Sequence, residues 1–432
     1  MTVRGAALLG VGAMVGAGIF ALLGEAGAVA GAATWISFLV AGVVSLLIGY
    51  NVVKLGVRYP SSGGLFQYLL EGFGNGRLLG IAAWLGYMSA VLIVCSMCAV
   101  SFGDYAVSLF VSEGGADWWD NVFASVVVIA MALVVIVGPD LVAKAQTLIV
   151  VIMVGILGVF VVVTLPSIDL DLLAFGDYPP VSDIVASVAL TFFAFLGFSV
   201  ITFAVGDMRD PARDLPKAMN RALVVTTLVY VLVAVSVFGT LTVDEVVRYG
   251  PTAIAEAGRP ALGDAGFTMI AIAAMVGMAG SVVATLYASA GLTRMLAGVG
   301  QFPPFFGPRS RLGAKSGVLI SAAVVLVVSN TVDLSAIASV GSACSLMIFV
   351  LVGVAGYRLR GKTGAQAWLI LAGVVVTLVV LGFFVVDTMR NAPETFAAIV
   401  LIGALAIVLD VVWKRVRGEP PASAPLTRAA QE

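Results

Sequence analysis

The sequence predicts an all-α polytopic membrane protein with about twelve transmembrane helices. Of its 432 residues, 61% are hydrophobic and only 11% are charged, and the mean hydropathy is +1.12. A soluble domain carries about 25% charged residues, so most of the exterior of this chain must face lipid. The formal net charge of -1 gives no reason to expect a nucleic-acid partner. The absence of histidine removes the commonest metal ligand and the commonest general base at neutral pH.

A transmembrane helix needs roughly 20 consecutive apolar residues. Runs that lack Asp, Glu, Lys and Arg meet or approach this length at 78–103, 121–139, 145–168, 184–206, 222–243, 265–293, 316–332, 334–357, 363–386 and 395–409. The stretch 5–53 holds one charge, Glu25, and a patch rich in Gly and Ala around Gly31 divides it into two crossings. A signal peptide cleaved near 28–30 is the less favoured interpretation, because this stretch carries Glu25 and a regular glycine pattern.

The basic residues separate clearly when loops are assigned alternately from a cytoplasmic N-terminus. Of the 23 Lys and Arg residues, only Arg248, Arg259 and Arg390 then fall outside. Cytoplasmic loops of membrane proteins carry an excess of Lys and Arg. Both termini are therefore predicted in the cytoplasm, in a multi-pass protein of the cytoplasmic membrane.

The membrane part is predicted to span 1–412, followed by a disordered cytoplasmic tail over 413–432 that is rich in Pro and Ala. The outer loop 244–264 contains short segments that could form helices over the outer mouth. The inner loop 54–77 predicts an amphipathic helix at the cytoplasmic surface, because apolar residues recur there at helical spacing. These residues are Phe66, Leu69, Leu70 and Phe73.

Two crossings look suited to an interruption of the helix. The first reads GAALLGVGAMVGAGIFALLGEAG, and the sixth reads TFFAFLGFSVITFAVG around Gly197. Matched interruptions in two halves of a membrane protein point to a transporter site built from inverted repeats. Close helix packing is the alternative for the first crossing, since Gly12 and Gly16 form a G-x-x-x-G motif.

Five segments give a resemblance to a known family. They read GAMVGAGIF, RYPSSGGLFQYLLEGFG, FFAFLGFSVITF, DMRDPARDLPKAM and SAGLTRMLAGVGQFPPFF, in this order along the chain. With them the chain resembles the amino acid–polyamine–organocation (APC) transporter superfamily. The resemblance implies a LeuT-type 5+5 inverted repeat, over roughly 5–165 and 182–357, plus two extra helices in 363–412.

The resemblance assigns roles in the first crossing. Ala17 and Gly18 are expected to present backbone N–H groups to a substrate carboxylate, and Gly16 to permit the break. The carbonyl of Met14 is expected to face the substrate ammonium.

In the sixth crossing the resemblance implies an aromatic gate at Phe193. The carbonyl groups of Ala194 and Leu196 are expected to face the ammonium, and Gly197 to mark the break. Packing in the core or against lipid is the alternative role for the aromatic side chains.

The same resemblance leaves the coupling ion open between H⁺ and Na⁺. Many relatives carry glutamate where this chain has Ser199, and some proton-coupled relatives carry a lysine where it has Met153. Sodium-coupled relatives supply hydroxyl groups from helix 8, often from neighbouring residues. Here Ser281, Thr285 and Ser289 are spaced four apart instead. No other cofactor or metal is expected.

Two charged residues fall within predicted spans, Glu25 in helix 1 and Asp104 late in helix 3. A charge inside a membrane is costly and suggests a functional role. Both are candidates for proton relay or gating, and solvation at the outer interface is the alternative.

These patterns predict a secondary active transporter that moves a small or neutral amino acid across the membrane by alternating access. An exchanger or ion-coupled carrier of another organic amine, or a channel-like carrier on the same fold, is the alternative. No intramembrane cluster of nucleophile, base or metal ligands suggests an enzyme, and no catalytic residue is assigned. The protein is expected to act as a monomer or homodimer in the lipid bilayer.

Overall fold

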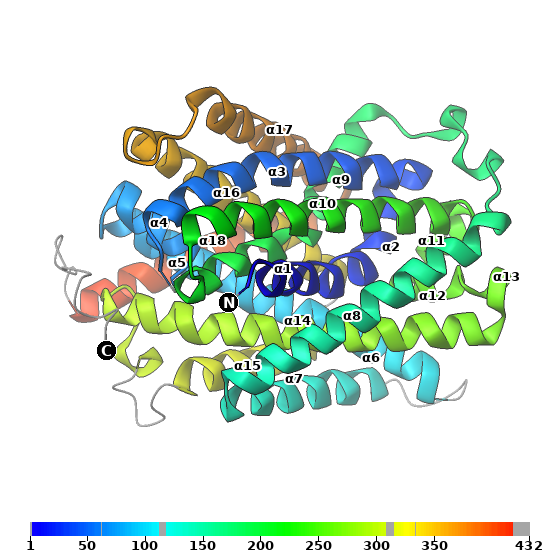
Figure 1. Ribbon diagram of the computed structural model, residues 1–432, viewed down its shortest axis with the longest axis horizontal. Coiled ribbons are helices and arrows are strands. Elements are labelled where there is room, and N and C mark those ends of the chain that lie inside the picture. The colour runs from blue at the N-terminus through cyan, green and yellow to red at the C-terminus, as the bar shows by residue number, and fades with distance from the viewer. Residues whose placement is uncertain (1, 62, 112–117, 308–314, 333, 418–432) are drawn as a thin grey trace.

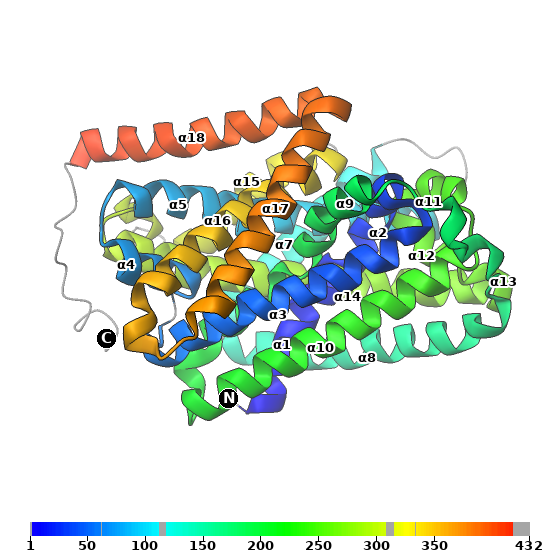
Figure 2. The ribbon, with the colours of Figure 1, turned by 90° about the horizontal axis from the view of Figure 1, so that it is seen from above.

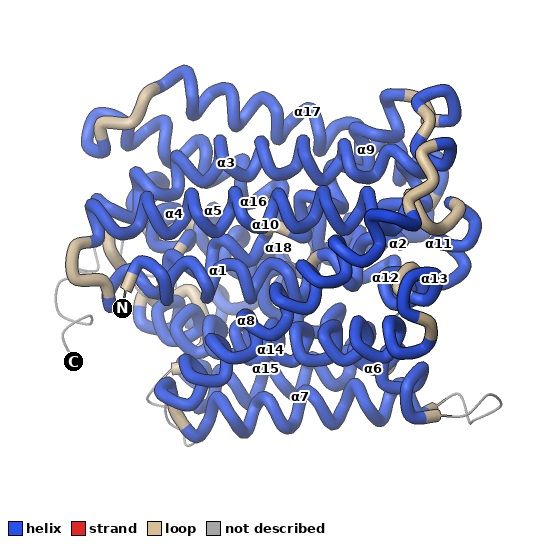
Figure 3. Tube along the Cα trace, turned by 45° about the vertical axis from the view of Figure 1, so that its right-hand side comes forward, coloured by secondary structure: helices blue, strands red, loops and turns tan. Residues whose placement is uncertain are grey.

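The computed structural model describes residues 2–61, 63–111, 118–307, 315–332 and 334–417. These residues form helices joined by short turns and contain no strand, as Figure 3 shows. Ten helices in this part of the chain are long and apolar enough to cross a membrane, and two shorter apolar helices, Val3–Gly16 and Ser316–Ser329, accompany them. The predicted all-α polytopic fold is confirmed, whereas the total of twelve crossings stays a prediction.

The first half of the chain follows the predicted runs closely (Figure 1). Its helices are α1 (Val3–Ala17), α2 (Ile19–Ala30), α3 (Thr34–Arg58), α4 (Leu65–Phe73), α5 (Arg77–Tyr87), a π-helical turn η2 (Met88–Ile93), α6 (Val94–Phe110), α7 (Trp119–Val137) and α8 (Pro139–Thr164). Single 3₁₀ turns lie at η1 (Gly31–Ala33), η3 (Leu165–Ser167), η4 (Asp171–Leu173) and η5 (Phe175–Asp177).

The second half contains a long 3₁₀ segment in place of one α-helical stretch. Its elements are α9 (Val181–Ala194), the 3₁₀ segment η6 (Leu196–Asp207), α10 (Pro211–Phe238), α11 (Val243–Tyr249), η7 (Gly250–Thr252), α12 (Ala253–Glu256), α13 (Arg259–Leu262), α14 (Asp264–Gly298), η8 (Pro304–Phe306), α15 (Ser316–Ser329), α16 (Leu334–Thr363), α17 (Ala367–Asn391) and α18 (Pro393–Arg417).

Most of the long helices run in roughly the same direction, with α8 inclined to them in Figure 1 and α17 in Figure 2, and short helices lie at the two ends of the bundle. Helix α4 lies at one end and α11 to α13 lie at the other (Figures 1 and 2). The loops assigned to opposite sides of the membrane thus lie at opposite ends of the molecule. Helices α17 and α18 form one edge of the bundle (Figure 2).

The outer faces of these helices are apolar. Leu133 on α7 is 57% exposed, and Leu401 on α18 is 67% exposed. Water would make such contiguous apolar surface unfavourable, whereas lipid is a suitable solvent for helices whose backbone groups are paired internally. The buried side chains line the opposite faces, around α1, α9, α14 and η6.

Helix α4 forms where the spacing of apolar residues predicted a helix. Phe66, Leu69 and Leu70 are buried rather than exposed at a membrane surface. The helix packs against α16, because an apolar stripe can cover another helix as well as lipid. The inner loop therefore closes part of that end of the bundle.

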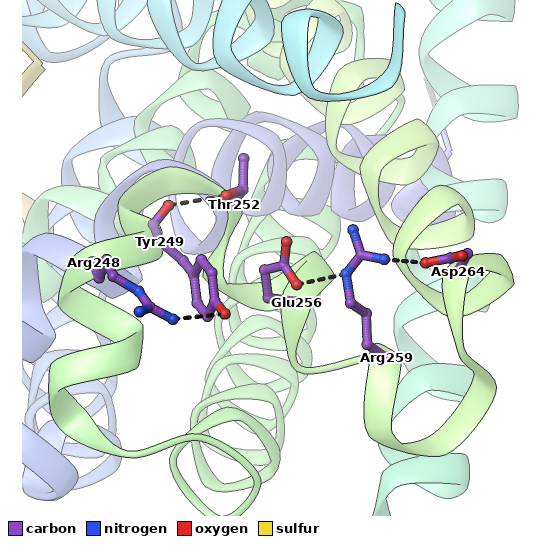
Figure 4. Close-up of polar contacts among 6 residues, drawn as sticks. All are labelled: Arg248, Tyr249, Thr252, Glu256, Arg259 and Asp264. Atoms are coloured by element: carbon purple, nitrogen blue, oxygen red, sulfur yellow. Dashed lines mark hydrogen bonds and ion pairs between the residues drawn. The ribbon is translucent and has the colours of Figure 1, made fainter. Parts of the chain in front are cut away.

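Helices α11, α12 and α13 lie at the opposite end of the bundle (Figures 1 and 2). The guanidinium group of Arg259 pairs with Glu256 at 2.6 Å and also with Asp264 (Figure 4). Arg248 donates a hydrogen bond to the hydroxyl group of Tyr249 at 2.9 Å. The two contacts of Arg259 link α13 to α12 and to the start of α14.

The last helix extends slightly further than predicted. Helix α18 continues to Arg417, so residues 413–417, which were expected in the tail, are helical. Residues 418–432 lie outside the described residues.

Candidate functional site

The first crossing is interrupted at Gly18, between α1 and α2. The N–H group of Gly18 donates to the carbonyl of Met14 at 2.7 Å, and its own carbonyl accepts from Leu22 at 3.0 Å. Ala17 is the last residue of α1. The irregularity thus involves a single residue, and the carbonyl of Met14 already has one hydrogen-bond partner.

The other predicted interruption lies where α9 changes into η6. Helix α9 ends at Ala194, and the twelve residues that begin at Leu196 form a 3₁₀ helix. Segments of this type longer than three or four residues are uncommon, and within a longer helix they often mark a functional hinge. Gly197 is the second residue of this segment.

Gly197 brings the two interrupted crossings into direct backbone contact. A Cβ atom added at Gly197 would lie 2.5 Å from the nitrogen of Met14 and 2.6 Å from the carbonyl oxygen of Ala13. Atoms at those distances overlap, so only glycine permits this approach. The sixth crossing therefore rests on the main chain of the first.

Three oxygen atoms surround Gly18. A Cβ atom added there would lie 2.7 Å from the carbonyl oxygen of Met14 and 2.8 Å from that of Ala194, and it would overlap the hydroxyl group of Tyr230. Tyr230 is fully buried on α10, and it donates a hydrogen bond to the Ala194 carbonyl at 3.0 Å. The carbonyl groups of Met14 and Ala194, both predicted to face an ammonium, therefore lie close together. The Tyr230 hydroxyl lies beside them.

Sequence reasoning missed Tyr230. The available signal was a single hydroxyl-bearing aromatic residue within the apolar run LVYVLVAV. A buried Tyr hydroxyl usually finds a hydrogen-bond partner, but the run does not show which residue provides it.

Gly16 faces a different neighbour, helix α14. A Cβ atom added at Gly16 would overlap the carbonyl oxygen of Gly277 and the hydroxyl group of Ser281. The Ser281 hydroxyl donates to the carbonyl of Gly12 at 3.3 Å. The fully buried thioether of Met153, on α8, lies against Gly277. Main chain and the Met153 thioether therefore occupy the part of the junction of α1, α8 and α14 around Gly16 and Gly277.

A cavity lies beside Leu196, between helices from both halves of the chain. Serine and threonine hydroxyl groups and apolar side chains line it, and none of the lining residues is charged. The lining residues are Leu65, Phe66, Ser89, Val91, Leu196, Ser199, Val200, Phe203, Thr285, Ala288, Leu292, Ser345, Ile348 and Phe349.

The π-helical turn η2 brings Ser89 to this cavity. The Ser89 hydroxyl lies 2.6 Å from that of Ser345 and 3.3 Å from the carbonyl of Gly341. Such π-helical turns are rare and are frequent at functional sites. The ring of Phe193 packs against Gly341 and does not line the cavity.

The cavity contains three of the predicted residues, Leu196, Ser199 and Thr285. Met14, Gly16, Gly18 and Ala194 lie at the adjoining helix contacts instead. Thr285 and Ser281 therefore have different surroundings, although both lie on α14.

The two charged candidates lie away from these groups. Glu25 is on α2 and half-buried, and Asp104 is half-buried on α6, where it experiences electrostatic repulsion from Asp120. In the described part of the chain, no three His, Cys, Asp or Glu residues lie close enough together to hold a metal ion.

Comparison with known proteins identifies the family. The family model described as amino acid permease matches residues 2–408. The chain is 28% identical to the inner membrane transport protein YbaT of Escherichia coli, over 94% of each chain. It is 25% identical to the methylthioribose transporter of Bacillus subtilis, over 82% of this chain and 80% of the relative.

A third relative shares about half of its length with this chain. It is the branched-chain amino acid permease BcaP of Bacillus subtilis, which is 27% identical over 54% of this chain and 53% of its own. The match to the family model covers nearly the whole chain, including every element of the candidate site. The chain therefore belongs to the amino acid permease family of the APC superfamily, and it is a multi-pass transporter of the cell membrane.

Proposed function

We propose that this transporter carries a small neutral amino acid, which binds where the first and sixth crossings meet. The observation that carries the proposal is the convergence of the Met14 and Ala194 carbonyl groups on Gly18. An ammonium group donates hydrogen bonds and needs acceptors of this kind. Buried carbonyl groups would bind it more strongly than water-exposed ones.

The carboxylate of the substrate needs donors, which the N-terminus of α2 supplies. The first N–H groups of a helix and its dipole both favour a bound anion. The Gly18 N–H group is bonded to Met14 in this arrangement, so binding requires the last turn of α1 to unwind. Unwinding would also release the Met14 carbonyl for the ammonium.

The uncharged cavity beside Leu196 favours a neutral side chain. A cationic side chain would need a carboxylate there, and the lining contains none. The names of relatives differ in the charge of the substrate side chain that they state. One is a branched-chain amino acid permease, and another is the cationic amino acid transporter 1 of Arabidopsis thaliana. The chemistry of the cavity therefore argues for the substrate class more directly than the relatives do.

Movement between the two sides of the membrane is proposed to follow alternating access. The two halves, roughly 5–165 and 182–357, each contribute one interrupted crossing to the site. Hinges at Gly18 and Phe195 would let the halves tilt about the bound substrate. Coupling to Na⁺ is not favoured, because main chain and Met153 occupy the junction of α1, α8 and α14 around Gly16 and Gly277.

A panel of labelled amino acids tests the proposal in proteoliposomes, with and without sodium and proton gradients. Saturable uptake of a small neutral amino acid is the expected result. Preference for arginine or another cationic amine would contradict the assigned substrate class. Ohmic current without amino acid flux would favour the channel-like alternative.

A further inference from the structure

Gln146, on α8, combines deep burial with two unsatisfied polar atoms. Only 3% of the residue is exposed. Its side-chain Oε1 and Nε2 atoms are both buried, and neither has a hydrogen-bond partner. Buried polar groups in proteins are usually paired, so an amide without partners requires an explanation.

The amide group lies between two glycines on two other helices. A Cβ atom added at Gly12, on α1, would lie 2.5 Å from Nε2, and one added at Gly280, on α14, would lie 3.5 Å from Oε1. Glycine at both positions lets the main chains of α1 and α14 approach the amide. The close approach removes solvent without providing a donor or an acceptor.

The rest of the same face of α8 is apolar. Val150 lies against Gly12, and Met153 lies against Gly277. Gln146 is the residue of this row nearest the start of α8. It contacts α1 at a point that is nearer the start of α1 than Gly16 is. This part of α1 is the end predicted to face the cytoplasm. The hydrogen bond from Ser281 to the Gly12 carbonyl, which also crosses this junction, is long at 3.3 Å.

We propose that Gln146 is a positioning residue that favours opening of the cytoplasmic half of helix 1. An unpaired buried amide destabilises the packed arrangement of α1, α8 and α14. When α1 tilts at Gly18, water reaches the amide and pairs both atoms, so the penalty disappears. The inference rests on the proposed function, because alternating access requires such a tilt.

The test measures how often α1 opens, and it needs no knowledge of the substrate. Ala6, on α1, is fully buried, and Ala6→Cys in the full chain reports on opening. Cys95, Cys98 and Cys344 are replaced by serine, and inside-out vesicles are treated with a membrane-impermeant methanethiosulfonate. Adding Gln146→Met, which keeps the shape but removes the polar atoms, is expected to slow labelling about tenfold.

Gln67 provides the matched control, since it is also a buried glutamine but has hydrogen-bond partners. Its Nε2 donates to Glu71 at 3.0 Å, and its Oε1 accepts from Ser61 at 3.4 Å. Gln67→Met is expected to lower thermal stability and leave labelling of Ala6→Cys unchanged.

Three results would overturn the inference about Gln146. They are an unchanged labelling rate in Gln146→Met, a faster one, or a loss of thermal stability, which would show that the amide is paired in the molecule. Failure to transport any amino acid would contradict the proposed function but leave this measurement intact.

Discussion

The hydroxyl group of Tyr230 donates a hydrogen bond to the carbonyl oxygen of Ala194 across 3.0 Å. That carbonyl is one of the two acceptors proposed for the substrate ammonium. The substrate must therefore compete with Tyr230 for the same lone pairs. When a protein group occupies a site in the absence of ligand, the ligand must displace it. The free energy of this displacement weakens the measured binding.

Tyr230→Phe is expected to bind substrate more tightly. Without the hydroxyl, the Ala194 carbonyl is left unpaired in the empty protein, at a cost of about 1–3 kcal/mol. The substrate ammonium removes this cost on binding. We expect KM to fall about fivefold or more in proteoliposome uptake.

Tyr105→Phe is the control for this measurement. Tyr105 is also fully buried, but its hydroxyl group has no hydrogen-bond partner, so KM should stay the same. A higher KM in Tyr230→Phe would show instead that the hydroxyl group itself binds the substrate.

Gly18→Ala is expected to reduce uptake per inserted molecule at least about tenfold. The φ angle of Gly18 is -88°, which alanine adopts readily, so any effect comes from the added methyl group. That group would overlap the Tyr230 hydroxyl. Gly155→Ala, on α8, adds a methyl group where nothing lies within 4 Å and should transport normally. Equal uptake by the two variants would argue against a site at Gly18.

Uptake is expected to be independent of sodium. Hard cations such as sodium prefer several oxygen ligands, whereas the junction of α1, α8 and α14 around Gly16 and Gly277 is occupied by main chain and the thioether of Met153. Replacing sodium with choline should therefore leave the initial rate unchanged in voltage-clamped proteoliposomes. A fall of fivefold or more would contradict this prediction.

The helices themselves could be predicted, because lipid imposes a minimum length and an apolar composition on every crossing. The glycines at 16, 18 and 197 also stood out, since repeated glycine in an apolar run indicates close backbone approach. The structure gives each of them a specific neighbour. Gly197, for example, lies against the main chain of Ala13 and Met14.

The side-chain contacts could not be predicted in the same way. Tyr230 and Ala194 are 36 positions apart, and no local pattern pairs them. The apolar stripe of α4 has the same spacing whether it covers lipid or α16. The sequence around Gln146 does not show that Gly12 and Gly280, from two other helices, pack against its amide group.

Proton coupling, if present, is expected to depend on Glu25 rather than on Asp104. Glu25 is on α2, the helix whose N-terminus is proposed to bind the substrate carboxylate. Asp104 lies in the second half of α6, near Asp120. Glu25→Gln should flatten the dependence of uptake on an imposed pH gradient, and Asp104→Asn should leave it unchanged. A response in Glu25→Gln identical to that of the parent would exclude Glu25 as the proton carrier.

The outer helix α11 begins with a capping box. The Thr242 N–H group donates to the Glu245 carboxylate at 2.9 Å, and the Thr242 hydroxyl accepts from the Glu245 N–H group at 3.3 Å. The hydrogen bond from the Thr242 backbone is the main reason that the pKa of Glu245 lies below its ordinary value. A carboxylate with a lowered pKa stabilises the folded helix above its unfolded pKa, and the effect disappears as pH falls through the folded pKa.

Protection of residues 243–249 against hydrogen exchange should therefore decrease as pH falls through the lowered pKa of Glu245. Because the Glu245 carboxylate is exposed and screened by water, we expect only about a twofold loss in the protection factor as it becomes protonated. Glu245→Gln should abolish the pH dependence, because its amide does not titrate. Asp244→Asn, one residue away but outside the capping box, should retain it. Equal pH profiles for the two variants would show that the Glu245 carboxylate does not stabilise this end of the cap over the outer mouth.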